Sequence, residues 1–281
     1  MSRLPFTKMH GIGNDYVYVD CFAHRVLDPA ALARVVSPRR TGVGSDGLIL
    51  ICPSQVADCR MEMYNADGSR GEMCGNGIRC VAKYAFERGL SRANPMRVET
   101  DAGIRILELH VRDARVAEVT VDMGAPILDG PQIPVAASGQ TIDAPLEVAG
   151  KTYRVTCVSM GNPHCVVFVP DVTAIDLAGL GPQFEHHAFF PRRVNTEFVQ
   201  VVGPHELTMR VWERGSGETA ACGTGACATV VAAVLNRRSE PTATVHLPGG
   251  DLRVEWRRTD DHVYMTGGAT TVFTGEIEVN P

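Results

Sequence analysis

Two cysteines occupy matching positions in this sequence, each directly before a Gly-x-Gly turn that opens a helical pattern. Cys74 begins the segment CGNGIRC, and Cys222 begins CGTGACA. The first N–H groups of a helix have no intrahelical partner, and the helix dipole is positive at that end. These features stabilise a thiolate, so each cysteine is predicted to have a lowered pKa and to act as a general base. The same N–H groups can bind a substrate carboxylate.

Helical patterns follow both cysteines. In the first, apolar residues recur at helical spacing from Ile78 to Phe86, and the pattern ends near Gly89. The second, residues 226–235, is apolar almost all round, which predicts a helix enclosed by other structure. Alternating or apolar runs predict strands at 15–20, 48–52, 59–64, 104–110, 153–158, 165–169, 197–202, 207–212 and 252–256.

One ungapped shift of 148 residues superimposes two separate motifs. It places Cys74 on Cys222 (222 − 74) and Gly13 on Gly161 (161 − 13). Two matches at a common offset indicate an internal duplication. We therefore expect two pseudo-symmetric α/β halves, residues 1–124 and 125–269. Whether residues 270–281 join the first half is left open.

A duplicated pair of thiols suits the inversion of a carbon centre. Pseudo-symmetry predicts that the two thiols face each other across a shared cleft. One thiolate can then remove an α-proton from one face of the substrate while the other thiol delivers a proton to the opposite face. Such a reaction needs no cofactor to define its stereochemistry.

Composition narrows the remaining possibilities. The 281 residues carry 27 basic and 32 acidic side chains spread along the chain, so no basic face is expected to bind nucleic acid. No signal peptide or membrane-length apolar run is evident, which predicts a cytoplasmic protein. The nine cysteines are expected to be reduced, and those in apolar segments are interpreted as structural: Cys21, Cys52, Cys59, Cys157 and Cys165.

Two other motifs do not indicate a function. The segment GVGSDG at 42–47 fits the loose pattern of a dinucleotide-binding loop, but a strand follows it where a helix is required. The adjacent His186 and His187 lack partners at metal-ligand spacing, so no metal site is expected.

Five separated blocks of the chain resemble diaminopimelate epimerases. They are HGIGNDYV at 10–17, GVGSDGLI at 42–49, NADGSRGEMCGNGIRC at 65–80, MGNPHCV at 160–166 and ERGSGETAACGTGA at 213–226. The resemblance implies an α/β (α+β) fold of two pseudo-symmetric halves, each a curved, mainly antiparallel sheet wrapped around a central helix. It places the active site in the cleft between the halves, and it implies a homodimer that works without pyridoxal phosphate or any other cofactor.

The resemblance also assigns residues. Cys74 and Cys222 become the acid/base pair, with His164 and Glu213 tuning the thiols. Arg214 suits a remote carboxylate, because its planar guanidinium can donate two parallel hydrogen bonds. Gly47 lies opposite Asn195 under the 148-residue shift and is left out of the site because it has no side chain. The residues expected around the substrate are Asn14, Asn65, Gly75, Asn76, Asn162, Asn195, Glu213, Arg214, Gly223 and Thr224.

The resulting hypothesis is interconversion of LL- and meso-diaminopimelate, a step of lysine biosynthesis. Two alternatives stay open at this point. The first is another amino-acid racemase on the same scaffold, acting on histidine or on proline derivatives. The second is a thiol redox or sensing protein in which Cys74 and Cys222 form a reversible disulfide.

Overall fold

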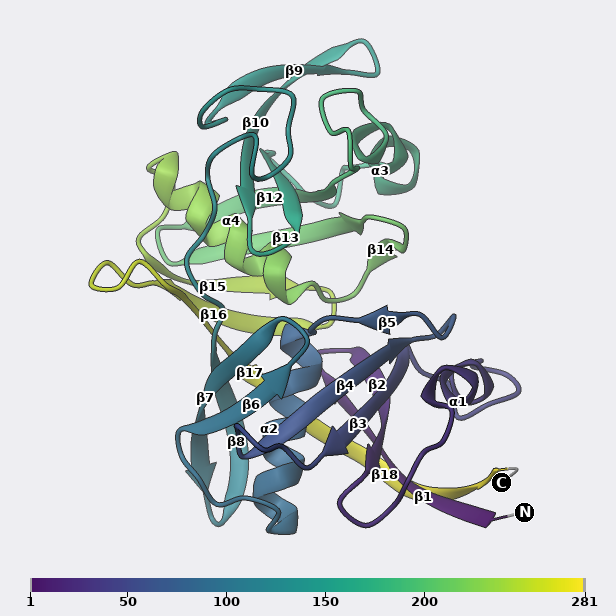
Figure 1. The fold of residues 1–281 in the computed structure, drawn as a ribbon. Coiled ribbons are helices and arrows are strands. Elements are labelled where there is room, and N and C mark those ends of the chain that lie inside the picture. Colours follow the sequence, from purple (N-terminus) through teal and green to yellow (C-terminus); the bar gives the residue numbers. More distant parts are fainter. Residues whose placement is uncertain (1, 280–281) are drawn as a thin grey trace. The chain divides into compact units, whose positions relative to one another are not determined.

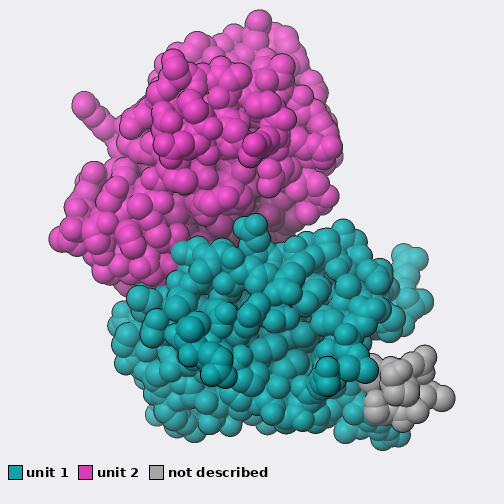
Figure 2. Space-filling model, viewed as in Figure 1, with its two compact units in different colours: residues 1–121, 266–281 teal, residues 122–265 magenta. Residues whose placement is uncertain are grey.

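The computed structural model describes residues 2–279, and the chain divides into two compact units (Figure 2). Unit 1 comprises residues 1–121 and 266–281, and unit 2 comprises residues 122–265. Strand β18 (Thr270–Val279) pairs antiparallel with β1 (Ser2–Gly11). The end of the chain therefore returns to the first unit, a point that the sequence left open.

A similar succession of elements occurs twice along the chain, and the second copy has one additional strand, β9, at its start (Figure 1). In unit 1, β1 is followed by β2 (Asn14–Asp20), α1 (Pro29–Val36), β3 (Gly47–Cys52), β4 (Cys59–Asn65), β5 (Arg70–Gly71), α2 (Gly75–Arg88), β6 (Met96–Thr100), β7 (Gly103–Arg112) and β8 (Arg115–Asp122). In the second succession, β9 (Ala144–Val148) and β10 (Lys151–Ser159) are followed by β11 (Pro163–Phe168), α3 (Leu177–Glu185), β12 (Asn195–Gly203), β13 (Glu206–Glu213), β14 (Gly217–Thr219), α4 (Gly223–Leu235), β15 (Thr242–Leu247), β16 (Gly250–Trp256) and β17 (Val263–Gly268).

The strand pairing repeats with the same register. β2 and β3 are parallel, with Tyr16 opposite Gly47, and β11 and β12 are parallel, with His164 opposite Asn195. Both residues of the second pair are displaced by 148 from those of the first. The helix between each parallel pair supplies the crossover that such a connection requires. The predicted duplication and the two pseudo-symmetric halves are confirmed.

The central helices follow the predicted patterns. Helix α2 ends at Gly89, which adopts a left-handed conformation with φ 76°, a common helix stop that glycine adopts without steric strain. Helix α2 packs against strands β1 to β4, β6 and β7, and α4 packs against β10 to β13, β15 and β16. The strands thus surround each helix, as Figure 1 shows. All nine strands predicted from the sequence are also present.

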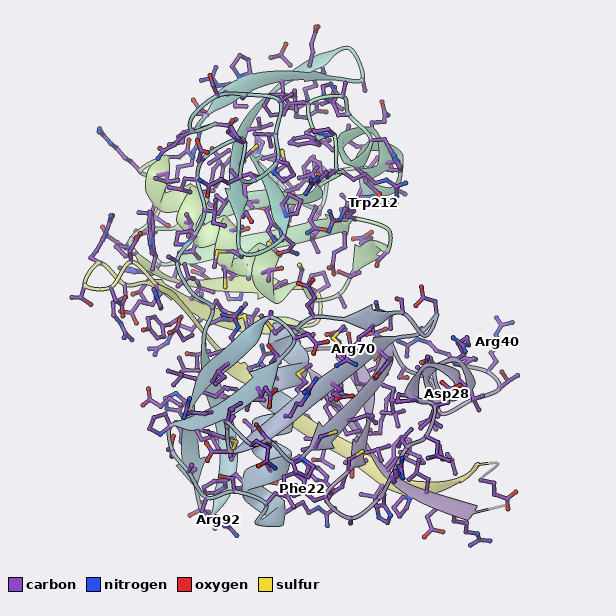
Figure 3. All side chains as sticks on the ribbon, viewed as in Figure 1. Phe22, Asp28, Arg40, Arg70, Arg92 and Trp212 are labelled. Carbon is purple, nitrogen blue, oxygen red and sulfur yellow. The ribbon has the colours of Figure 1, made fainter. Side chains whose placement is uncertain are left out.

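Helices α1 and α3 were not predicted. Each begins after an aspartate whose carboxylate accepts a hydrogen bond from the helix backbone, Asp28 for α1 and Asp176 for α3. Helix α1 is only eight residues long, and α3 contains two glycines and Pro182, which hide its helical pattern. Tertiary contacts stabilise α3: the indole N–H of Trp212, labelled in Figure 3, donates to Glu185 at 2.8 Å.

Each unit has its own apolar core, built mainly from its strands. In unit 1 the core includes Val17, Leu48 and Leu50, with α1 packed on it through Ala33 and Val36. In unit 2 it is centred on Phe184 and Phe198, whose rings lie edge to face at 5.6 Å. Within residues 2–279 all nine cysteines are free thiols, and no helix is long and apolar enough to span a membrane.

Gly11 should be essential to the packing of β1 against α2. A Cβ atom there would lie 2.8 Å from the carbonyl oxygen of Asn76 and 2.9 Å from the guanidinium of Arg79. We expect Gly11→Ala to lower the free energy of unfolding by about 1–3 kcal/mol, because the strand must move away from the helix. Urea denaturation measures this change. Gly203→Ala is the matched control, since a Cβ at Gly203 meets nothing within 4 Å; equal stability losses in both variants would contradict the prediction.

Candidate functional site

Cys74 and Cys222 are the residues that precede the first turns of α2 and α4. The Cys74 sulfur accepts a hydrogen bond from the N–H of Gly77 at 3.3 Å. Gly225 occupies the equivalent position in α4, where a side chain would meet two neighbouring groups. A Cβ there would lie 2.7 Å from a carboxylate oxygen of Glu197 and 3.1 Å from the Cys222 sulfur. The glycine therefore lets the carboxylate approach the helix beside the thiol.

Asn14 connects the Cys74 thiol to the loop before β3. Its side-chain oxygen accepts a hydrogen bond from the Cys74 sulfur at 3.2 Å and lies 3.5 Å from the amide nitrogen of Asn76. Its own amide nitrogen donates to Asp46 at 2.7 Å, and Asp46 is held in turn by Arg39 at 2.8 Å. Asp46 belongs to the GVGSDG segment, which therefore orients a candidate site residue.

A phenol and a buried cation complete the surroundings of Cys74. The hydroxyl of Tyr16 lies beside the thiol and opposes the rise in its pKa. Arg79 is fully buried on α2, where its guanidinium donates to the carbonyl oxygen of Gly75 at 3.1 Å and to the side-chain oxygen of Asn76 at 3.0 Å. The positive charge of Arg79 opposes the rise in the pKa of Cys74 that burial causes.

Acidic groups surround Cys222 instead. Glu213 lies beside the thiol, and its carboxylate accepts a hydrogen bond from the hydroxyl of Thr219. Thr224 lies on the other side, with its hydroxyl oxygen 3.6 Å from the Cys222 sulfur. Burial raises the pKa of the Glu213 carboxyl, so this group can hold a proton more readily than an exposed glutamate.

His164 and Glu197 form a second polar group near Cys222. Both side chains are fully buried, and Nδ1 of His164 lies 2.6 Å from Oε1 of Glu197. The other ring nitrogen lies 3.0 Å from the side-chain oxygen of Asn162. The amide nitrogen of Asn162 donates to the hydroxyl of Thr224 at 3.2 Å. A continuous series of hydrogen bonds thus leads from Glu197 to the first turn of α4.

The predicted lowering of the thiol pKa values is wrong. Burial raises the pKa of Cys74 above its ordinary value, despite hydrogen bonds from the N–H groups of Gly77 and Asn76. Burial raises the pKa of Cys222 further, and the charges of Glu213 and Glu197 add to the rise. The cost of removing a thiolate from water thus outweighs the helix terminus.

The remaining predicted residues lie farther along the same elements. Asn195, buried at the start of β12, accepts a hydrogen bond from the backbone N–H of Arg214 at 2.8 Å. The exposed guanidinium of Arg214 donates to the carbonyl oxygen of Arg192 at 3.0 Å. Asn65 ends β4, where its amide nitrogen donates to Ser69 at 2.9 Å within a turn. The structure gives Asn65 no contact with Cys74.

Gly47 cannot easily be replaced in this backbone. A Cβ at this position would lie 2.1 Å from the carbonyl oxygen of Tyr64. The close approach of β4 to this position accounts for the glycine. The related position in unit 2 carries Asn195. Among residues 2–279 no group of three or more His, Cys, Asp or Glu side chains is arranged to hold a metal ion.

Sequence reasoning missed four polar residues beside the thiols. The 148-residue shift places Tyr16 on His164, so the repeat itself could have identified Tyr16. The available signal for Glu197 was its position as a single acidic residue within an apolar strand. For Arg79 it was the position of a single arginine within an apolar helix face. No sequence signal marked Asp46, because its partner Asn14 is 32 residues away.

Alkylation should distinguish the two thiols. We expect the rate of reaction with iodoacetamide to rise at lower pH for Cys74 than for Cys222, because two carboxylates raise the pKa of Cys222 while Arg79 acts oppositely on Cys74. Peptide mass spectrometry between about pH 7 and about pH 11 shows the pH at which the rate at each cysteine begins to rise, a measure independent of accessibility. An onset at lower pH for Cys222 than for Cys74 would contradict this.

Comparison with known proteins identifies the family. The family model described as diaminopimelate epimerase matches residues 6–128 and 156–272. A protein of Acetivibrio thermocellus named diaminopimelate epimerase is 56% identical over 278 residues, covering 99% of each chain.

Solved structures share the fold at much lower identity. A phenazine biosynthesis protein of the PhzF family from Bacillus anthracis has a TM-score of 0.73 and 15% identity, covering 99% of this chain and 100% of the other. A probable proline racemase from Agrobacterium radiobacter has a TM-score of 0.71 and 14% identity, covering 99% and 94%. These two structures show the fold alone. The family model and the relative from Acetivibrio thermocellus also show the family: the chain belongs to the diaminopimelate epimerase family.

Proposed function

We propose that this protein interconverts LL- and meso-diaminopimelate, in lysine biosynthesis, by moving the α-proton between Cys74 and Cys222. Family membership supports the substrate and the isomerase activity. The observation that carries the mechanism is the duplicated helix start: each unit holds one thiol at the beginning of a buried helix. Inversion requires one proton-transfer group on each face of the α-carbon, and two such thiols meet that requirement.

The proposed reaction begins with one sulfur as thiolate and the other as thiol. The thiolate takes the α-proton, and the electron pair of the broken C–H bond passes into the substrate carboxylate. The second thiol then donates its proton to the opposite face of the carbon. The two sulfurs have now exchanged protonation states, so the reverse reaction uses the same groups in opposite roles.

The raised pKa values suit this chemistry. An α-proton of an amino acid is only weakly acidic, and a thiolate of higher pKa is the stronger base toward it. N–H groups at the first turns of α2 and α4, at Gly75–Asn76 and Gly223–Thr224, would bind the reacting carboxylate and stabilise its developing charge. Asn14 and Asn162, which lie beside these turns, would hold the polar groups of the substrate.

Arg214 would recognise the second amino-acid end of the substrate. Its guanidinium is exposed and bonded to a backbone carbonyl, so it can turn toward a carboxylate without breaking an ion pair among the described residues. Charge-assisted paired hydrogen bonds would then distinguish a long, doubly charged substrate from proline or histidine. The homodimeric state implied by the resemblance and the cytoplasmic location expected from the sequence form part of the same proposal.

Serine at either cysteine should abolish inversion. We expect Cys74→Ser and Cys222→Ser each to lower turnover at least about 100-fold, because a hydroxyl is far less acidic than a thiol and cannot serve as the base. Incubation with LL-diaminopimelate in heavy water, followed by NMR, measures α-deuterium uptake. Cys21→Ser is the control, since this half-exposed thiol lies outside both helix starts. Full activity in both single variants, or turnover of proline or histidine by the unaltered protein in place of diaminopimelate, would reject the proposal.

Arg214→Met should separate binding from chemistry. We expect KM for diaminopimelate to rise at least about tenfold, which corresponds to about 1.4 kcal/mol of lost binding, while kcat changes little. Steady-state kinetics with both stereoisomers tests this. Arg253→Met, which removes an exposed arginine from β16, controls for net charge. A kcat loss with unchanged KM would show that Arg214 acts on the reacting centre instead.

A further inference from the structure

Glu197 is an acidic side chain buried in an otherwise apolar strand, and neither the resemblance nor the proposed mechanism gives it a role. It lies on β12, fully buried, with Oε1 2.6 Å from Nδ1 of His164. Its other oxygen, Oε2, has no hydrogen-bond partner among the described side chains and backbone. A buried carboxyl group with a single partner is costly. Because the group costs stability, its role is to be sought in its one partner, His164.

The hydrogen bonds of His164 favour one arrangement of its protons. The Asn162 side-chain oxygen, 3.0 Å from Nε2, can only accept, so this contact is a hydrogen bond when Nε2 carries a proton. The proton of the Nδ1 hydrogen bond is shared with Glu197. Glu197 therefore completes a pair that holds one proton between its two members and presents a second proton to Asn162.

The direction of this donation continues to the thiol. With its oxygen engaged by His164, Asn162 turns its amide nitrogen toward Thr224 and donates to the hydroxyl oxygen at 3.2 Å. The hydroxyl hydrogen of Thr224 is then free to point at the Cys222 sulfur, 3.6 Å away. A donor at this position stabilises the thiolate and partly offsets the rise in the pKa of Cys222 caused by burial.

The related asparagine in unit 1 has the opposite orientation. Asn14 donates its amide nitrogen to Asp46 at 2.7 Å and turns its oxygen toward Cys74 and Asn76. The two asparagines occupy equivalent places in the repeat, so the backbone does not decide which end of the amide meets the helix. Their partners decide it, Asp46 in unit 1 and His164 in unit 2.

We propose that Glu197 is a positioning residue of the epimerase reaction: by sharing one proton with Nδ1 of His164 it allows Nε2 to keep another, and so orients Asn162 and Thr224 as hydrogen-bond donors toward Cys222. This inference rests on the proposed function of Cys222 as an acid/base group. Glu197 itself does not contact substrate in this role. It acts through His164, Asn162 and Thr224.

Two substitutions at Glu197 separate positioning from charge. In Glu197→Gln the side-chain nitrogen can donate to Nδ1, so a neutral imidazole keeps its proton on Nε2 and the series of donors survives. In Glu197→Met the length is similar but Nδ1 has no partner, so a neutral imidazole can place its single proton on either nitrogen. We expect kcat to stay within about threefold of the wild-type value in Glu197→Gln and to fall at least about tenfold in Glu197→Met, with KM little changed in both.

Nitrogen-15 NMR of histidine-labelled protein gives a readout that is independent of turnover. The His164 signals, assigned by their loss in His164→Gln, should show a protonated Nε2 in the wild type and in Glu197→Gln, and a partly unprotonated Nε2 in Glu197→Met. Wild-type kcat and an unchanged His164 spectrum in Glu197→Met would overturn the proposal. Equal loss of kcat in both variants would also overturn it, because charge and not orientation would then be the contribution of Glu197.

The measurements also separate this inference from the proposed function. If the wild-type protein takes up no α-deuterium from heavy water, the proposed function fails, yet the NMR spectra still decide whether Glu197 holds the Nε2 proton. Should Glu197→Met not fold, as judged by circular dichroism, Glu197→Gln decides alone: a retained Nε2 proton together with retained kcat supports the proposal, and loss of either one overturns it.

Discussion

The buried first turn of a helix is the constraint on which this structure depends. In α2 and in α4 the residues directly after the cysteine are glycines or other small or polar residues that lie among strands. Their N–H groups need partners, because an unpaired buried donor costs free energy comparable to a lost hydrogen bond. The Cys74 sulfur accepts a hydrogen bond from the N–H of Gly77 in α2, whereas no side chain caps the start of α4. N–H groups at a helix start suit an anionic ligand.

Burial changes what the helix start does to a thiol. The sheet that surrounds each helix removes water from the cysteine, and this raises the thiol pKa more than the N–H groups lower it. A thiol in this state resists ionisation and is a strong base once ionised. The proposed removal of a weakly acidic α-proton requires that strength, so the enclosure that destabilises the thiolate would also supply its reactivity.

The two units share a backbone but differ in charge at equivalent places. Unit 1 carries Tyr16 and a buried Arg79 beside Cys74, whereas unit 2 carries His164, Glu197 and Glu213 around Cys222. The register of the strands is the same, with a constant displacement of 148 residues, so the differences arise from side chains alone. A repeated fold thus provides two thiols whose pKa values are adjusted separately.

The sequence by itself determined the repeat, the two helices with their cysteines, and nine of the strands, because these depend on local patterns: hydrophobic period, glycine at helix ends, and one constant offset. It also identified Asn14, Asn162, His164 and Thr224, which the structure brings to the helix starts. Only the tertiary structure decided the thiol pKa values, since desolvation depends on what surrounds a group and local sequence does not reveal it. The contacts of Asp46 with Asn14 and of Glu197 with His164 join residues about thirty positions apart, so no local pattern could have revealed them.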